Sequence, residues 1–141
     1  MGETTESYPE AVADHIANPR NMGDLSSPDG FGWAARSCGD FMQVFLRVRD
    51  GKITDARFMT EGCGPMVACG SVLTETVKGK PVTDALGIDE DDIMKGLEGL
   101  PESERHCSTV AVVALRQALR DFLSLQREPW KRAYRKATPF S

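Results

Sequence analysis

The spacing of apolar residues changes at Gly62-Cys63-Gly64-Pro65, and this change constrains the fold more than any other feature of the sequence. Before it, apolar residues alternate with polar ones, as in Val44, Leu46 and Val48, which predicts a half-buried strand. After it, apolar residues recur at steps of three and four: Met66, Cys69, Leu73 and Val77. That second spacing is typical of a helix. A chain that passes so abruptly from strand to helix predicts a packed α+β domain.

The residues before this junction predict a three-stranded antiparallel sheet. Asp50-Gly51 separates two strand-like runs and is a strong signal for a hairpin turn. The returning run, residues 53–61, loses its alternation near Thr54-Asp55, which predicts a bulge at that point. An earlier strand at about residues 31–36 is expected to complete the sheet.

Helical spacing surrounds this sheet region in the sequence. The predicted helices are residues 8–17, the stretch from Pro65 to Gly79, residues 82–86 and 89–98, and a long element from about 103 to 125. The long element carries an apolar stripe at Ala111, Leu115, Ala118, Phe122 and Leu125. We expect these helices to cover one face of the sheet, so that residues 1–125 form a single two-layer domain and residues 126–141 a basic tail or short helix.

Composition argues against several classes of function. A net charge of −4 gives no general attraction for nucleic acid. No segment approaches the roughly 18 consecutive apolar residues of a membrane span, and the first residues lack the features of a signal peptide. A cytoplasmic location is therefore expected. In that reducing compartment, four cysteines are more typical of metal ligands, catalytic thiols or buried residues than of disulfides.

Cys63 is the strongest candidate for a working thiol. Glycines flank it, and Pro65 marks the start of the predicted helix, so the thiol is sterically open at a helix N-terminus that stabilises thiolate. Cys69 instead lies on the apolar stripe, about 240° around the helix from Cys63. We expect Cys69 to be a packing residue, which argues against a redox pair.

The remaining chemical positions also lie where loops meet helices or strands. They are Cys38 and Asp40, before the second strand, and His106 and Cys107, near the start of the long helix. A helix start favours a reactive thiol at Cys107, and a histidine beside it is expected to be a ligand or proton donor. Three thiolates suit zinc or iron–sulfur chemistry, but their separations are much longer than those of zinc fingers. Spacing alone leaves open a shared site and three unrelated cysteines.

Short motifs spread over about residues 8–123 occur in the order and spacing of a known family. They are Tyr8…Asp14-His15…Asn18-Pro19-Arg20-Asn21…Gly23, Cys38-Gly39-Asp40, Asp55-Ala56-Arg57-Phe58, Gly62-Cys63-Gly64, Thr74-Glu75…Val77-Lys78-Gly79-Lys80, Leu100-Pro101 and His106-Cys107-Ser108. With these motifs the sequence resembles the IscU/NifU-type scaffold family of iron–sulfur cluster assembly. The pattern of three cysteines and one aspartate is highly specific to that family.

The resemblance implies a cluster site and a cargo. The cluster would be held by Cys38, Cys63 and Cys107, with Asp40 or His106 as the fourth ligand. A 2Fe–2S cluster is expected, a 4Fe–4S cluster on a dimer is the alternative, and zinc can occupy such a site in purified protein. An oxygen or imidazole ligand makes one corner labile, which suits a carrier that has no turnover of its own and must give up its cluster.

The resemblance also implies protein partners: a cysteine desulfurase, an iron donor or frataxin-like protein, a ferredoxin and apo-protein clients. Cys107 is the expected acceptor of sulfur from the desulfurase. In typical members a DnaK-like chaperone binds the segment after Leu-Pro. Here Leu100-Pro101 is followed by the acidic Glu102-Ser103-Glu104-Arg105, which argues against dedicated chaperone release. A lysine often found near the site is Glu104 here, and Arg105 could partly replace its charge.

Two other functions fit the same residues. In the first, Cys38, Asp40, Cys63, His106 and Cys107 hold zinc in a sulfur acceptor that serves a desulfurase. The adjacent histidine and the short segment before Cys107 argue against that sulfurtransferase class. In the second, the metal is structural, and its removal should unfold the domain.

Overall fold

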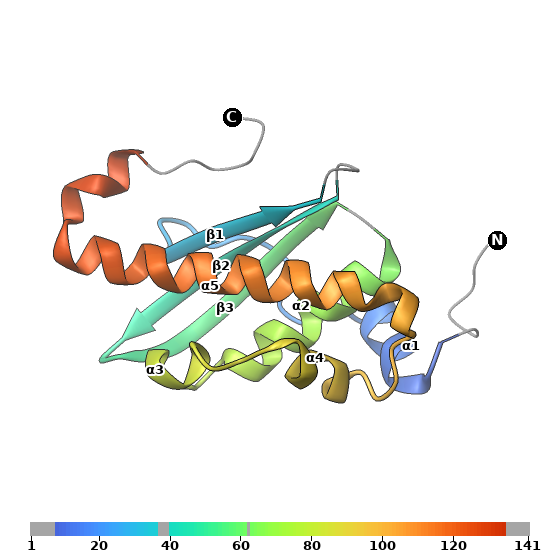
Figure 1. The fold of residues 1–141 in the computed structure, drawn as a ribbon. Helices are drawn as coiled ribbons and strands as arrows, with labels where there is room; N and C mark the ends of the chain where they lie inside the picture. Colours follow the sequence, from blue (N-terminus) through green and yellow to red (C-terminus); the bar gives the residue numbers. More distant parts are fainter. Residues whose placement is uncertain (1–7, 37–39, 62, 135–141) are drawn as a thin grey trace.

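The structure is a computed structural model, and it describes residues 8–36, 40–61 and 63–134. One antiparallel sheet has the strand order β1-β2-β3, formed by β1 (Gly30–Ala35), β2 (Phe41–Arg49) and β3 (Lys52–Glu61). A long helix crosses this sheet, and shorter helices lie beside it (Figure 1). The predicted α+β class and the three-stranded sheet are confirmed.

The hairpin that joins β2 to β3 has the predicted turn and bulge. Asp50 and Gly51 both have positive φ angles, 53° and 77°, as a tight turn between two strands requires. The pairing register shifts between Arg47 and Val48, so that Thr54 is the extra residue in β3. Both the turn and the bulge of this hairpin therefore follow from the local sequence.

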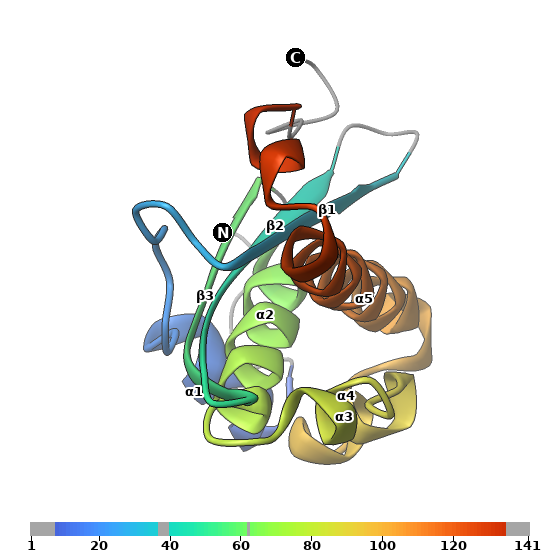
Figure 2. The same cartoon turned by 90° about the vertical axis from the view of Figure 1, so that its left-hand side faces the viewer.

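Two helices cover the same face of the sheet. α2 (Gly64–Val77) packs on β3, whereas α5 (Arg105–Arg127) packs on β1 and β2 (Figure 2). The predicted stripe of α5 is buried: Ala111, Leu115, Ala118, Phe122 and Leu125. α5 approaches β1 so closely that a Cβ added at Gly32 would lie 2.3 Å from the backbone nitrogen of Ala118. Glycine is required at that contact.

Three shorter helices agree with the predicted ranges to within a few residues: α1 (Glu10–Ala17), α3 (Val82–Ala85) and α4 (Glu90–Gly96). Two 3₁₀ helices are also present: η2 (Glu102–Glu104), which was not predicted as a separate element, and η3 (Pro129–Tyr134), which lies in the range expected to be a tail or short helix. The long helix begins at Arg105 instead of about residue 103, because η2 precedes it. It also continues to Arg127, just past the predicted end of the domain. In the described ranges, no helix combines the length and apolarity needed to cross a bilayer.

α2 is buried on more sides than a single apolar stripe predicts. The stripe residues Met66, Cys69, Leu73 and Val77 are fully buried, and Ala68, Gly70, Ser71 and Thr74 are buried as well. The reason is that α1, α4, α5 and β3 all pack against this helix. Gly79, with φ of 88°, follows its last turn and ends it as predicted. The predicted packing role of Cys69 is confirmed.

Candidate metal centre at two helix N-termini

Cys63 lies at the exposed N-terminus of α2. It is the N-cap residue, with extended backbone angles, and its carbonyl oxygen accepts hydrogen bonds from the backbone of Met66 (3.0 Å) and Val67 (3.3 Å). Pro65 occupies the first turn, where a missing N–H has no consequence. The side chain of Cys63 is solvent-exposed, so the predicted position of this thiol is confirmed.

Cys107 is the third residue of α5 and is fully buried. Burial raises the pKa of its thiol, and the neighbouring Cys69 and Cys63 raise it further. Burial therefore opposes the ionisation that a helix N-terminus favours, and the expected reactivity of this thiol stays a prediction. A metal ion that replaces the thiol proton would reverse this balance.

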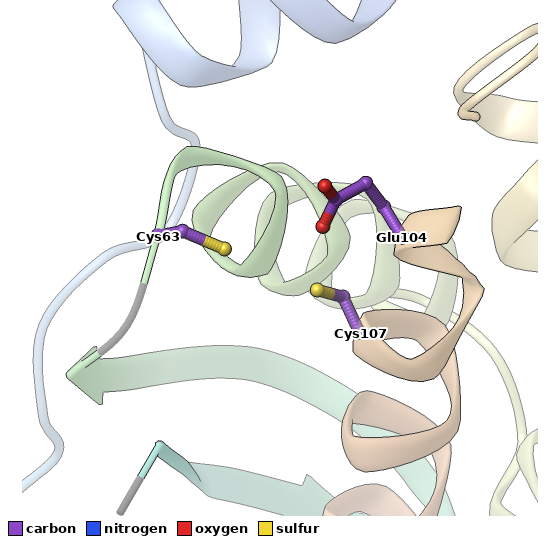
Figure 3. A group of neighbouring side chains, drawn as sticks. All are labelled: Cys63, Glu104 and Cys107. Atoms are coloured by element: carbon purple, nitrogen blue, oxygen red, sulfur yellow. The ribbon is translucent and has the colours of Figure 1, made fainter. Parts of the chain in front are cut away.

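A carboxylate completes a group with these two thiols. One ligand atom from each of Cys63, Glu104 and Cys107 lies within 4.8 Å of the others. Figure 3 shows the two sulfur atoms facing each other between α2 and α5, with the Glu104 carboxylate beside them. We did not predict Glu104 as a ligand from the sequence. The signal was its position three residues before Cys107, a spacing that places two side chains on one face of a helical turn.

The structure places the other predicted ligands differently. Cys38 falls outside the described residues, and Asp40 is half-buried directly before β2. His106 lines a groove of about 300 Å³ whose other walls are Ala34, Ala35, Arg36, Thr109, Val110 and Val113. Within the described ranges, neither Asp40 nor His106 belongs to the group around the two thiols. Their assignment as ligands stays a prediction.

Cys69 lies in the core behind this group. Burial, reinforced by Cys63 and Glu104, raises the pKa of its thiol to about 12. It is therefore a neutral thiol at physiological pH and packs as a small apolar residue. This agrees with the sequence-based interpretation that Cys63 and Cys69 have different roles.

Arg105 does not supply a positive charge to the thiols. Its guanidinium lies 2.8 Å from the Asp91 carboxylate of α4 and 3.7 Å from that of Glu102. The suggestion that Arg105 replaces a lysine near the site is therefore wrong for this structure. The charged side chain beside the thiols is the Glu104 carboxylate.

This arrangement can bind a metal of intermediate softness. Two thiolates and one carboxylate suit zinc or iron, and a fourth position remains for another ligand. Exposed Cys63 provides the approach from solvent, while buried Cys107 anchors the inner side. The geometry therefore defines a class: a small α+β domain in which two thiols from helix N-termini converge with a carboxylate.

The family comparison agrees with this class. Residues 7–128 match the NifU-like N terminal domain family. This chain belongs to that family.

Its relatives include proteins named iron–sulfur cluster assembly scaffold protein IscU. The Escherichia coli K12 protein is 44% identical over 123 residues, which cover 84% of this chain and 95% of the relative. The Aquifex aeolicus protein is 42% identical over 122 residues, covering 84% and 78%. A solved NifU-like N-terminal structure from Brucella abortus has a TM-score of 0.69 at 20% identity, over 82% of this chain and 94% of that one, and shows the same fold.

Proposed function

We propose that this protein is a scaffold on which an iron–sulfur cluster is assembled and from which it passes to apo-proteins. The observation that carries the proposal is the convergence of Cys63 and Cys107, from two different helix N-termini, with a carboxylate beside them. The relatives named as IscU scaffolds support it. The cluster is the cargo of such a protein, which has no turnover of its own.

The proposed roles of the residues follow from their exposure. Exposed Cys63 meets incoming iron or sulfur first, and buried Cys107 holds the cargo on its inner side. Cys38 supplies the third thiolate, and Asp40 or His106 remains a candidate for the fourth place. An oxygen ligand in a thiolate site makes one corner exchangeable, as release requires.

We further propose that sulfur comes from a cysteine desulfurase, with an iron donor, a ferredoxin and apo-protein clients as the other partners. Cys107 remains the predicted sulfur acceptor. Because its thiol is buried in the metal-free protein, docking of the desulfurase must first expose it. The acidic Glu102-Ser103-Glu104 segment argues against an apolar chaperone groove as a partner.

A zinc-bound sulfur acceptor is the second candidate function. It is favoured by the same mixed sulfur and oxygen donor set, which suits tetrahedral zinc as well as iron. The two functions differ in what they carry, because a scaffold holds iron and sulfide together whereas the acceptor carries sulfur on a zinc-bound thiol.

The test is anaerobic reconstitution of the full chain with iron, cysteine, a desulfurase and a thiol reductant, which supplies the electrons that convert persulfide sulfur to sulfide. Mössbauer spectra and iron and sulfide analysis would be recorded for the wild type, Asp40→Ala and Cys107→Ser. We expect a 2Fe–2S cluster that passes to an apo-ferredoxin and lives longer in Asp40→Ala. Cys107→Ser should accept less labelled sulfur from the desulfurase.

Three results would count against these assignments. Zinc retained with sulfur transfer intact, and no cluster formed, would favour the zinc-bound acceptor. Equal sulfur labelling of Cys107→Ser and wild type would remove Cys107 as the acceptor. An unchanged cluster lifetime in Asp40→Ala would show that Asp40 is not the labile corner.

A further inference from the structure

The Glu104 side chain is directed at the thiols and not at its own helix. Glu104 is the N-cap residue of α5, yet its side chain makes no capping hydrogen bond to the helix backbone. Its carboxylate belongs to the 4.8 Å group with Cys63 and Cys107, and Figure 3 shows it beside both sulfur atoms. The side chains that cap a helix N-terminus are typically those of Ser, Thr, Asp and Asn. The longer Glu104 side chain forms no such cap, so its carboxylate is available to a ligand.

No cation among the described residues neutralises this carboxylate. Arg105, the next residue, pairs with Asp91 and Glu102. In the part of the chain that the structure describes, the Glu104 carboxylate has no ion pair and no hydrogen bond with a side chain. A half-buried carboxylate beside two thiols therefore lacks a counter-charge within this region.

The electrostatic energy of the group formed by Cys63, Glu104 and Cys107 is unfavourable without a cation and favourable with one. The Glu104 carboxylate and any thiolate formed at Cys63 or Cys107 repel one another, because all three carry negative charge within a few ångströms. A divalent ion placed between the three groups would reverse the sign of each interaction, because both thiolates and the carboxylate would then face positive charge. The three side chains thus fit a metal-bound state better than the metal-free one.

Helix geometry favours Glu104 over His106 as the partner of Cys107. Residues three apart on a helical turn share a face, whereas adjacent residues do not. Accordingly, Glu104 lies with the Cys107 thiol, and His106 lines the groove formed with Ala34 and Ala35. A carboxylate oxygen is therefore already beside the thiols before any metal arrives.

We infer that Glu104 is a direct ligand of the divalent metal ion, ferrous iron in the scaffold and zinc or cobalt in vitro, that binds first between Cys63 and Cys107. The inference rests on the proposed function for the identity of the ion. The donor set itself, two sulfurs and one carboxylate oxygen, rests on the geometry. The inference adds the Glu104 carboxylate to the ligands of the proposed scaffold site and gives this carboxylate a role in the affinity for the first metal ion.

The experiment is titration of the metal-free full chain with Co²⁺ under anaerobic conditions. The sulfur-to-cobalt charge-transfer band reports thiolate ligation, the visible bands report coordination geometry, and competition with a chelator gives the zinc affinity. The variants are Glu104→Gln and Glu104→Asp, with Glu102→Gln as the matched control from the same 3₁₀ turn. Asp40→Asn and Cys63→Ser complete the set, and circular dichroism checks that each variant is folded.

We expect Glu104→Gln to weaken zinc and cobalt affinity by about 10- to 100-fold or more, since changes even beyond the direct ligands reach that size. Its charge-transfer band should persist because both thiolates remain, while the visible bands change. Glu104→Asp should retain part of the affinity, and Glu102→Gln should bind as the wild type does.

Wild-type affinity in Glu104→Gln would overturn the inference, and affinity lost in Asp40→Asn would then assign the oxygen ligand to Asp40. Tighter binding in Glu104→Gln would also overturn it, by showing that the carboxylate hinders metal entry. Wild-type affinity in Cys63→Ser would instead contradict the metal site and with it the proposed function. The two failures are therefore distinguishable.

Discussion

Polar groups contact helix α2 in two regions of the molecule. In one region they bond to each other, and in the other they are placed to bind a metal ion. Where α1 packs on α2, three residues form hydrogen bonds with one another: His15, Arg20 and Ser71. We call these three residues the polar junction. Ser71 Oγ lies 2.6 Å from His15 Nδ1 and accepts a hydrogen bond from the Arg20 backbone N–H at 2.9 Å. At the N-terminus of α2, the thiol corner of Cys63, Glu104 and Cys107 brings together three donor groups for metal.

This difference separates polar groups that stabilise the fold from polar groups that are available to bind a ligand. Buried polar groups that bond one another hold a fold in place, and removing one partner leaves the others unsatisfied. Ligand atoms that converge without a counter-charge are instead suited to bind a metal ion from solution. The thiol corner should therefore control metal binding with little effect on folding, and the polar junction should do the opposite.

The largest expected effect is on metal binding by Cys63→Ser. Replacing this thiolate should weaken zinc or cobalt affinity by about 100-fold or more, beyond the range for indirect partners. Because Cys63 is exposed, the free energy of unfolding of the metal-free protein should change by less than about 0.5 kcal/mol. Chelator competition and urea denaturation measure the two quantities. A loss of stability comparable to the loss of affinity would remove the contrast between the regions.

The next effect is on stability in Ser71→Ala. This change leaves the Arg20 N–H without its acceptor and removes the 2.6 Å partner of His15, whose Nδ1 keeps only the Arg20 guanidinium at 3.2 Å. Loss of these hydrogen bonds in a buried position costs about 1–3 kcal/mol of unfolding free energy. Urea denaturation measures it, with Ser124→Ala near the end of α5 as the control. Metal affinity should stay unchanged. Weaker metal binding in folded Ser71→Ala would show that the two regions are coupled.

The smallest expected effect is a pH dependence that arises at the polar junction. Burial, and then the charge of Arg20, lowers the pKa of His15 below its ordinary value of 6.5. The unfolded chain therefore binds a proton at a higher pH than the folded protein does. The stability contributed by neutral His15 is present above about pH 6.5 and decreases as the pH falls through the lowered pKa.

Urea denaturation of the metal-free protein at pH 7.5, 6.5 and 5.5 measures this dependence. The decline toward acid should be shallower in His15→Gln than in the wild type. Comparison of the two proteins removes the contribution of His106, which both retain. Equal slopes would show that His15 titrates alike in the folded and unfolded states.

Local sequence predicted most of the fold because each signal acted over a few residues. Asp50-Gly51 set the hairpin turn, and Gly79 ended α2, because both positions need a positive φ. The start of α5 was less well predicted. Pro101 and the acidic residues after it form a 3₁₀ turn before the helix, which moves the first helical residue to Arg105.

The candidate site was predictable only in part. The flanking glycines and Pro65 identified Cys63 as an exposed thiol, since those features are local. Adjacency to Cys107 suggested His106 as a ligand, but neighbouring residues on a helix face different directions. The structure placed Glu104 beside the thiols instead. The burial of Cys107, which opposes ionisation of its thiol, was not predictable, because a helix N-terminus is a local feature whereas burial depends on the whole fold.

By itself, the sequence determined the order of strands and helices, the turns between them and the positions of the thiols along the chain. These properties follow from backbone preferences and hydrophobic spacing, which nearby residues fix. Only the tertiary structure decided which side chains meet. The packing of α5 across the sheet brings Cys107 and Glu104 to Cys63, and it also buries Cys107, because contacts between distant segments depend on how all the layers pack together.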